Sequence, residues 1–379
     1  MLQVNALIIF LAISFIASCS QSNQPQEYVE LGSEVEFPAV DLWLSITDSI
    51  GIEFGDSNLV FGMPNVAFRM SENRIAVMDM LKAKISIFNI NGSFLSTVGR
   101  QGSGPGEFLQ PSWFSVTPSG GIVVSDGMGR KLVSFDSDLV YTGSMNSFFP
   151  SPPDRTVFLN DSVFVGIIPD YEMNGQEIHA GFSVALWSFD SLEPEHFYYR
   201  ELALFDPANP FNSEAAQPIF TMSPEGTVYT SVRSTDEFSI HAWNLDGSLL
   251  FTITEPYIKK AKTQEEVDRE LETTRSFMRR AGMPDSFLNS IGPEPYYYAI
   301  TSLGVGPDGN LWVALGIYGH PVFRVYDPNS GEYLFTAALE CPENKRDLSI
   351  IVNKWGFIAL NPMSDKWPRV YILNPKAEY

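Results

Sequence analysis

The chain has 379 residues, of which 44% are hydrophobic, 13% aromatic and 18% charged. This composition excludes an intrinsically disordered protein, which combines few aromatic residues with a high charge density. With 45 acidic and 24 basic residues the formal net charge is −21, so the surface repels phosphate backbones and no nucleic-acid partner is expected. The length allows two or three small domains or one large β architecture.

The chain opens on a predicted export signal. Residues 6–16 form an apolar run that only Ser14 interrupts; it has the length of a signal-peptide core and is too short to span a bilayer. The run leads into the residues Ile16-Ala17-Ser18-Cys19, which resemble the bacterial lipobox. No Lys or Arg precedes the run, and the alternative is a plain secretory signal whose cysteine has no role.

The lipobox resemblance implies that Cys19 is lipidated and anchors the protein to a membrane. Each buried methylene contributes about 0.8 kcal/mol, so two or more acyl chains give a stable anchor. Residues 1–18 are then the signal peptide and residues 19–40 a polar tether. We expect an outer-membrane lipoprotein of the cell envelope that faces either the periplasm or the cell surface. With Cys19 lipidated, Cys341 cannot form an intramolecular disulfide.

A repeated pattern fills the rest of the chain. Six times, a turn precedes a short apolar strand, first at residues 73–77 and last at 355–359, and an aromatic residue follows one strand later. The aromatic positions are Phe88, Phe135, Phe189, Trp243, Tyr326 and Tyr371. A period of roughly 40–50 residues with short strands indicates a β-propeller. We therefore expect residues 41–379 to form an all-β, six-bladed propeller whose aromatic rings fill the space between blades.

The ends of the chain predict how the ring closes. The last repeat, residues 347–374, has room for three strands, whereas a propeller blade needs four. Residues 43–50 can supply the fourth strand, because the residues after them repeat the pattern that follows the outer strand of the first blade. We expect this N-terminal strand to pair with the C-terminal blade, which hides two sheet edges.

A family resemblance appears between the first two repeats. The segment GRQGSGPGEFLQP, residues 99–111, resembles the signature between blades of NHL-repeat propellers, and Asp79 and Asp126 match the recurring strand-end Asp of that family. The chain after the tether is similar to six-bladed, TolB-like propeller lipoproteins. The resemblance implies a ring with a central channel and a loop face that binds ligands or partners. The motif is clear only in the first two repeats.

Residues 255–295 break the β pattern. Thr263 and Glu266 form a capping box, apolar residues follow at helical spacing as far as Met278, and Gly282 suits the helix end. We expect a helical insertion at about residues 257–294, between blades four and five. It is either a lid or docking element over the central channel, or a helix that only covers exposed blade edges.

No catalytic set emerges from the sequence. No two histidines lie at helical metal-ligand spacing, and no carboxylate pair or serine nucleophile has a supporting context. The histidines are His179, His196, His241 and His320. We therefore predict no catalytic residue, no metal site and no cofactor, and we expect the strand-end aspartates Asp79, Asp126, Asp236 and Asp365 to cap turns. The alternative for these aspartates is Ca²⁺ binding, as in lactonase-type propellers.

The sequence favours a binding function, in which one face of the predicted ring contacts a ligand or partner. Arginine and aromatic side chains anchor many binding interfaces, and six candidates of this kind lie in loops predicted for the insertion side. These ligand-binding candidates are Arg100, Arg130, Arg233, Tyr318, His320 and Trp367. We expect a monomeric, non-enzymatic scaffold that binds a protein, peptide or glycan. The alternatives are a metal-dependent envelope hydrolase or lyase, of the lactonase or amidating-lyase kind, and a structural subunit of an envelope complex.

Overall fold

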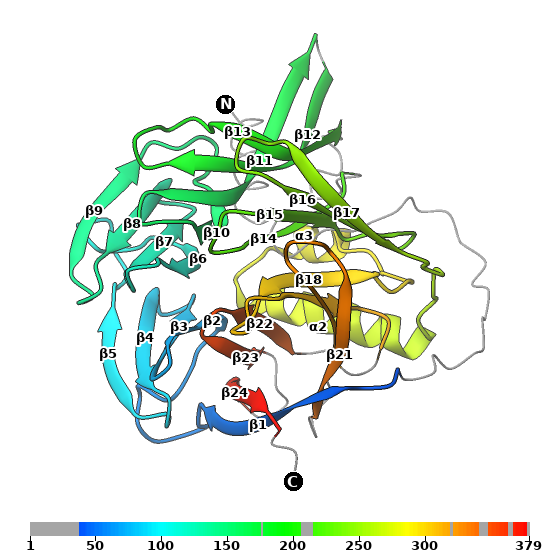
Figure 1. The fold of residues 1–379 in the computed structure, drawn as a ribbon. Helices are drawn as coiled ribbons and strands as arrows, with labels where there is room; N and C mark the ends of the chain where they lie inside the picture. Colours follow the sequence, from blue (N-terminus) through cyan, green and yellow to red (C-terminus); the bar gives the residue numbers. More distant parts are fainter. Residues whose placement is uncertain are drawn as a thin grey trace.

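The computed structural model describes residues 38–175, 177–205, 215–318, 321–340, 348–362 and 367–376. Within them, antiparallel four-stranded units surround a common axis (Figure 1). In five of these units the strands follow outward from the axis in chain order, and in the sixth the outermost strand comes from the N-terminal part of the chain. No helix of the described residues is both long and apolar enough to cross a membrane.

The strands of the described residues group into six blades, and in each blade the inner strand is named first. Blade 1 consists of β2 (Pro64–Ser71), β3 (Arg74–Asp79), β4 (Lys84–Asn89) and β5 (Phe94–Val98). Blade 2 consists of β6 (Pro111–Val116), β7 (Ile122–Asp126), β8 (Lys131–Phe135) and β9 (Tyr141–Asn146). Blade 3 consists of β10 (Asp154–Phe158), β11 (Val163–Asn174), β12 (Glu177–Ser188) and β13 (His196–Leu204).

The second half of the ring continues in the same way. Blade 4 consists of β14 (Pro218–Met222), β15 (Val228–Val232), β16 (Phe238–Trp243) and β17 (Leu249–Glu255). Blade 5 consists of β18 (Ile300–Val305), β19 (Leu311–Leu315), β20 (Val322–Tyr326) and β21 (Tyr333–Glu340). Blade 6 consists of β22 (Ser349–Asn353), β23 (Gly356–Asn361), β24 (Arg369–Pro375) and the N-terminal strand β1 (Leu42–Ile50).

Strand β1 joins the two ends of the chain, as predicted. It pairs antiparallel with β24, with Ile50 opposite Val370. Its first residues also pair in parallel with β21 of blade 5, with Leu44 opposite Leu339, and this second pairing was not predicted. The inner strands contact one another in the order β2, β6, β10, β14, β18, β22 and back to β2. The ring is therefore closed.

The repeated aromatic residues pack in the core, which confirms the sequence prediction. Phe88 and Tyr326 lie in the third strands of their blades and are at most 1% exposed. Phe88 meets Phe61 and Phe94 edge to face, with ring centres 6.1 and 5.9 Å apart. Edge-to-face contacts of this kind stabilise a pair by about 0.5–1.5 kcal/mol beyond the burial of area. Phe88 and Tyr326 therefore contribute to the packing of the core.

The helical insertion lies between β17 and β18, also as predicted. Helix α2 (Gln264–Arg280) begins at the capping box, in which Thr263 Oγ1 accepts from the Glu266 N–H (3.3 Å) and the Glu266 carboxylate accepts from the Thr263 N–H (2.9 Å). Helix α3 (Asp285–Ser290) follows after a short turn. The reciprocal capping bonds satisfy two backbone donors that a helix start leaves unpaired.

The end of α2 is fixed by a tight turn and a small apolar contact. The N–H of Met283 donates to the carbonyl of Met278 (3.0 Å), and Gly282 between them has φ 83°. This is the hydrogen-bond pattern of a Schellman motif, which favours glycine at the left-handed position. Phe287 and Leu288 of α3 then pack on Met278. The two helices therefore form one compact unit.

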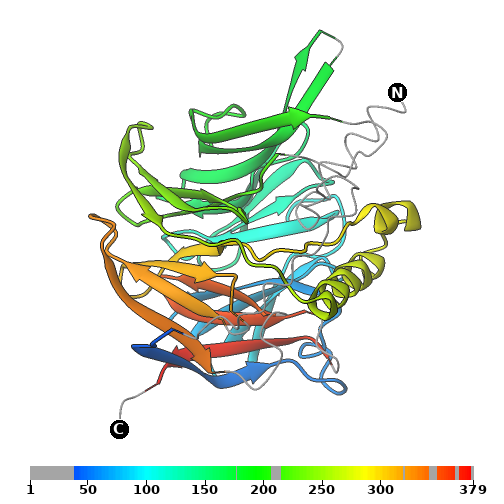
Figure 2. The ribbon, with the colours of Figure 1, turned by 90° about the vertical axis from the view of Figure 1, so that its right-hand side faces the viewer.

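Helix α2 crosses from the rim of the ring towards its axis. At its start the Lys262 N–H donates to the Pro295 carbonyl (2.8 Å). At its end Arg280 Nη2 donates to the carbonyl of Gly62 (3.1 Å), just before the inner strand of blade 1. A helix of 17 residues spans about 25 Å. Figure 1 shows α2 running from the periphery towards the centre, and Figure 2 shows the insertion on one face of the ring. We call this face the insertion face.

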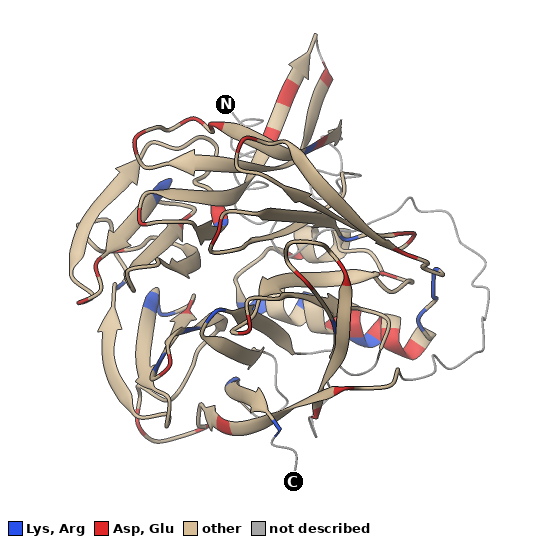
Figure 3. Cartoon of the chain, viewed as in Figure 1, with Lys and Arg blue, Asp and Glu red and all other residues tan. Residues whose placement is uncertain are grey.

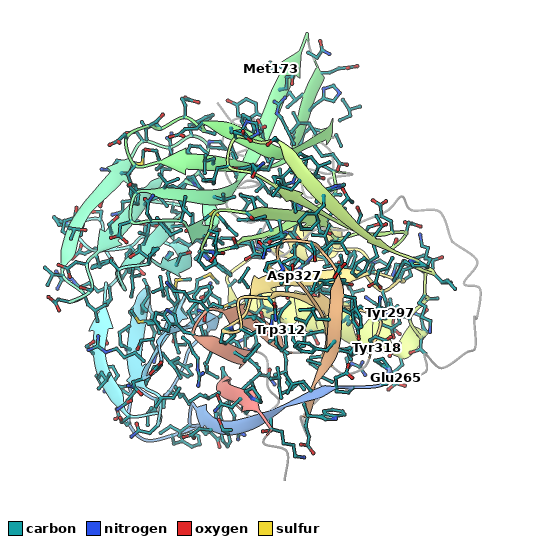
Figure 4. The ribbon with its side chains drawn as sticks, in the orientation of Figure 1. Met173, Glu265, Tyr297, Trp312, Tyr318 and Asp327 are labelled. Carbon is teal, nitrogen blue, oxygen red and sulfur yellow. The ribbon has the colours of Figure 1, made fainter. Side chains whose placement is uncertain are left out.

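Blade 3 differs from the other blades in the length of one hairpin. Strands β11 and β12 have 12 residues each, and their far end projects beyond the ring (Figure 1). Met173 lies near the tip of this hairpin and is 66% exposed (Figure 4).

Candidate functional site

Five of the six predicted ligand-binding residues belong to the insertion face. They lie in linkers between blades or in turns between the second and third strands of a blade, and both kinds of loop leave the sheets at the end where the insertion does. The five are Arg100, Arg130, Arg233, Tyr318 and Trp367. The sixth, His320, lies outside the described residues, as does Cys19. Tyr318 is half-buried against the core cluster between blades 4 and 5.

Arg100 has a partner within its own Gly-rich linker. Its guanidinium lies 2.7 Å from Glu107 Oε1, and Glu107 Oε2 accepts from the Gly104 N–H (2.8 Å). These two hydrogen bonds hold the pKa of Glu107 below its usual range. A Cβ at Gly102 would lie 2.1 Å from the same carboxylate. The loop is therefore filled by the protein's own carboxylate, which explains its glycines without a phosphate ligand.

Arg130 and Trp367 are also held by their surroundings. Arg130 Nε donates to the carbonyl of Phe148 (2.6 Å) in the linker that leads to blade 3. Trp367 Nε1 donates to the carbonyl of Gly51 (3.1 Å), and the Arg369 guanidinium lies 4.4 Å from a ring centre of Trp367. Both side chains therefore fasten linkers to neighbouring turns, so they contribute to the rigidity of the insertion face.

The strand-end aspartates of the first two blades cap linkers, as predicted. Asp126 is fully buried and accepts from the N–H groups of Leu109 (2.9 Å) and Gln110 (2.8 Å). Asp79 makes the same pair of bonds to the linker before β2, at 2.7 and 3.0 Å. Each carboxylate thus joins a linker to the turn beside it, which explains why the Asp recurs with the Gly-rich motif.

Asp236 of blade 4 differs from this pattern. Its Oδ1 accepts from Lys259 Nζ (3.0 Å), which ties the turn to the start of the insertion. Asp365 lies outside the described residues. Among the residues that the structure describes, no three His, Cys, Asp or Glu side chains are arranged to hold a metal ion.

The inner strands begin with a recurring β-bulge that the sequence analysis missed. In blades 1, 2 and 5 the pairing with the next strand gains one residue, at Asn65, Ser112 and Thr301. In blade 3 the gain falls between Asp154 and Val157. A bulge re-aims the side chain of the extra residue. Asn65 Nδ2 donates to the Ser112 carbonyl (2.9 Å), so these positions link neighbouring inner strands around the axis.

Arg155 lies in the bulge of blade 3. Its φ of 50° is in the left-handed region that residues other than glycine rarely adopt. Its guanidinium lies 6.0 Å from the ring centre of Trp113 on the neighbouring inner strand. Burial and the positive charge of Arg233 lower the pKa of Arg155 to about 10. Burial raises the pKa of the adjacent Asp154 to about 6.

Gln217 and Arg233 lie opposite one another on the next blade, where the Arg233 N–H donates to the Gln217 carbonyl (3.0 Å). Gln217 is 1% exposed, yet neither its Oε1 nor its Nε2 has a hydrogen-bond partner, and the buried Nε of Arg233 also has none. Buried polar atoms are nearly always hydrogen-bonded. Three unsatisfied atoms on two adjacent residues therefore mark a place for a polar ligand or ordered water.

The helical insertion contributes further residues near Gln217 and Arg233. The ring centre of Tyr298 lies 5.9 Å from the Arg233 guanidinium, and Glu294 Oε2 lies 3.9 Å from Lys262 Nζ. Burial raises the pKa of Glu294, although Lys262 and Arg233 act in the opposite direction. Two guanidinium groups, one amide and two carboxylates thus meet beside the insertion. We call these residues the axial cluster: Asp154, Arg155, Gln217, Arg233 and Glu294.

Of the axial cluster, only Arg233 is among the ligand-binding residues that the sequence predicts. One signal was present: a proline precedes the polar residue at the start of the inner strands of blades 1, 2 and 3, as in Pro64-Asn65, Pro111-Ser112 and Pro153-Asp154. Proline is favoured at the first residue of a strand. A polar residue directly after it, where a buried strand should begin, indicates a position that faces the axis.

Comparisons with known proteins agree on the fold. A sequence family, DUF5128, described as a 6-bladed beta-propeller, matches residues 22–149. The solved structure of a member of the DUF4221 family from Bacteroides vulgatus is similar with a TM-score of 0.51 and 10% identity, over 89% of this chain and 99% of that chain. The chain is a six-bladed β-propeller.

Two further solved structures resemble the propeller at lower scores. One is a candidate exported protein from Bacteroides fragilis, with a TM-score of 0.48 and 15% identity over 88% of this chain and 96% of that chain. The other is virginiamycin B lyase from Staphylococcus aureus, with a TM-score of 0.40 and 12% identity over 89% of each chain. No curated protein matches the chain in sequence. What the propeller binds must therefore be argued from its own residues.

Proposed function

We propose that the chain is a lipid-anchored binding protein of the bacterial cell envelope, which holds a ligand on the insertion face of its propeller. The observation that carries the binding proposal is the set of three buried, unsatisfied polar atoms of Gln217 and Arg233 at the axial cluster. The anchoring proposal is supported by the apolar run at residues 6–16 and the lipobox-like residues 16–19.

The surrounding fold suits a preformed binding site. Asp154 and Arg155 lie at the start of the inner strand β10, and Gln217 directly precedes the inner strand β14. Asp79, Asp126 and Trp367 fasten other loops of the insertion face. A site on rigid elements loses little conformational entropy when it binds, so more of the contact energy appears as affinity. Arg155, which Trp113 contacts from the neighbouring strand, is held at the axis in the same way.

The anchoring proposal is tested by replacing Cys19. In a bacterium that processes lipoproteins, the unmodified chain should take up labelled palmitate and fractionate with membranes. The Cys19→Ser variant should do neither, whereas Cys341→Ser should behave like the unmodified chain. An unlabelled Cys19 chain would overturn the anchoring proposal.

The binding proposal is tested with glycan and peptide arrays probed by the purified Cys19→Ser chain. Binding should be lost when Arg155→Gln and Arg233→Gln are combined, because both changes lie at the axial cluster. Glu225→Gln is the matched control, since this exposed residue lies in the turn between β14 and β15, on the opposite face. Binding that survives the double change and disappears with Glu225→Gln would place the ligand elsewhere.

Elemental analysis distinguishes a metal-dependent hydrolase or lyase, which is the alternative, from the proposed binding protein. Purified propeller with stoichiometric Zn²⁺ or Ca²⁺ would support that alternative, because such enzymes act through a bound metal ion. A binding protein without chemistry is expected to bind its ligand unchanged, which mass spectrometry of the recovered ligand can verify.

A further inference from the structure

We propose that the axial cluster binds a carboxylate that carries a hydrogen-bond donor, a hydroxyl or an amide N–H, on the neighbouring carbon. This inference rests on the proposed binding function and names its ligand class. Arg155 and Arg233 take the carboxylate, and the Gln217 amide takes the neighbouring donor. The assignment follows from which polar atoms lack a partner, which charges surround them and which groups hold the two arginines.

The unsatisfied atoms define what the ligand must bring. Arg233 Nε and Gln217 Nε2 are donors and need acceptors, whereas Gln217 Oε1 is an acceptor and needs a donor. A fully ionised inorganic anion supplies acceptors only and leaves Oε1 unsatisfied. A carboxylate beside a hydroxyl or an amide N–H supplies both within the span of two bonded carbons. It therefore satisfies all three atoms at once.

The charges favour one negative charge on the ligand. Arg155 and Arg233 are close enough for the charge of one to depress the pKa of the other, so an anion between them relieves their repulsion. The carboxylates of Asp154 and Glu294 face the same cluster and disfavour a second negative charge. A monoanionic carboxylate fits this balance better than a phosphate dianion. The chain as a whole is strongly acidic, with a net charge of −21. An anionic ligand is therefore attracted only by the two arginines near it and not by the protein as a whole.

Aromatic rings orient both arginines. Trp113 lies 6.0 Å from the Arg155 guanidinium and Tyr298 lies 5.9 Å from the Arg233 guanidinium. A ring beside a guanidinium restricts its orientation, and the planar guanidinium group suits the two oxygens of a carboxylate. The left-handed backbone at Arg155 is a local strain at the same place, as is common at ligand sites.

Calorimetric titration of the purified Cys19→Ser chain tests the proposal with two probes that share the required chemistry. D-gluconate represents a sugar acid, with a hydroxyl on the carbon beside its carboxylate, and N-acetylglycine represents a peptide C-terminus. We expect one or both to bind at least tenfold more tightly than D-sorbitol, acetate and inorganic phosphate. The tighter probe identifies the source of the ligand. Equal affinities for all five compounds, or no heat of binding with either probe at millimolar concentration, would overturn the proposal.

Two variants test the assigned roles. Arg233→Gln should weaken both probes at least tenfold. Gln217→Met, which keeps the side-chain volume, should weaken the better probe to the level of acetate and leave acetate itself unchanged. Gln217→Met should also keep or raise the melting temperature of the free protein, since it removes an unsatisfied buried amide. A fall of several degrees together with unchanged probe affinity would show that ordered water satisfies Gln217, and would overturn the proposal.

Failure of this inference can be told apart from failure of the proposed function. A chain that binds an array ligand through the axial cluster, but neither carboxylate probe, would overturn the ligand class and leave the binding function standing. A chain whose array binding is indifferent to Arg155→Gln and Arg233→Gln would overturn both.

Discussion

Arg280, at the end of α2, donates a hydrogen bond from Nη2 to the carbonyl oxygen of Gly62, 3.1 Å away and 218 residues earlier in the chain. The bond joins the insertion between blades 4 and 5 to the linker that leads into blade 1. The Gly62 N–H in turn donates to Asp79 (2.7 Å). The C-terminal end of α2 is therefore hydrogen-bonded to the linker that Asp79 caps, just before the inner strand of blade 1.

Arg280→Ala should loosen the insertion without unfolding the ring. A lost hydrogen bond from a partly exposed charged donor lowers the free energy of local opening by about 1 kcal/mol, which makes amide exchange in residues 264–290 roughly fivefold faster. Arg279→Ala is the matched control, because Arg279 is 57% exposed and its nearest carboxylate oxygen, on Glu272, is 3.8 Å away. Equal exchange in the two variants would contradict the fastening role.

Asp126→Ala should cost about 2–4 kcal/mol in the free energy of unfolding. The change leaves the N–H groups of Leu109 and Gln110 without their carboxylate acceptor, and it leaves the buried Lys131, whose Nζ is 3.9 Å away, without its counter-charge. Chemical denaturation measures the loss.

The control for that loss is Asp136→Ala. Asp136 caps an exposed turn through the N–H of Val140 (2.9 Å), and surface changes of this kind cost about 1 kcal/mol or less. Similar losses for the two aspartates would show that the buried cap is no more important than an ordinary turn.

Removing β1 should destabilise the whole ring. Deletion of residues 40–50 exposes the edges of β24 and β21, and the single change Leu44→Ala should cost about 2–4 kcal/mol because Leu44 is fully buried between blades 5 and 6. Thermal melting measures the loss of stability in the deletion variant and in Leu44→Ala, and Ser49→Ala, a change at an exposed residue of the same strand, is the control. An unchanged midpoint after the deletion would mean that β1 does not hold the ring closed.

Asp154 should make stability depend on pH. Its pKa in the folded protein, about 6, lies above the ordinary value of 3.8, so the folded state binds the proton more tightly than the unfolded state does. The contribution of this group is therefore complete below pH 4 and is lost as the pH rises through about 6. A shift of this size corresponds to about 3 kcal/mol.

The measurement is the difference in unfolding free energy between Asp154→Asn and the unmodified chain. That difference should move in favour of the variant as the pH rises from 4 to 7, because the variant does not have to bury a charge at this position. The exposed Asp138→Asn is the comparison at each pH. A difference that stays constant from pH 4 to 7 would contradict the raised pKa.

Local sequence signals were sufficient for the fold. The capping box at Thr263 and Glu266 and the glycine at residue 282 predicted α2 because a helix start and end depend on a few adjacent residues. The repeated pattern after Gly51 and Gly99 predicted that β1 completes blade 6. The parallel pairing of Leu44 with Leu339 could not be predicted, since it depends on how closely blades 5 and 6 approach after the ring has closed.

The candidate site was much less predictable. Arg100 and Trp367 looked like free anchors in the sequence, but Glu107 and the Gly51 carbonyl engage them. Gln217 has no motif around it, and its importance lies in burial without a partner, which depends on blade packing rather than on neighbouring residues. Charge is equally uninformative: Figure 3 shows acidic and basic bands alternating along α2, so composition does not single out the axial cluster.

Strand β1 also fixes the side from which the chain enters the disc. It begins on the face opposite α2 and runs towards the insertion face, where it ends at Ile50 (Figure 2). The first residues of β1 and the two arginines of the axial cluster, Arg155 and Arg233, therefore lie at opposite faces of the propeller.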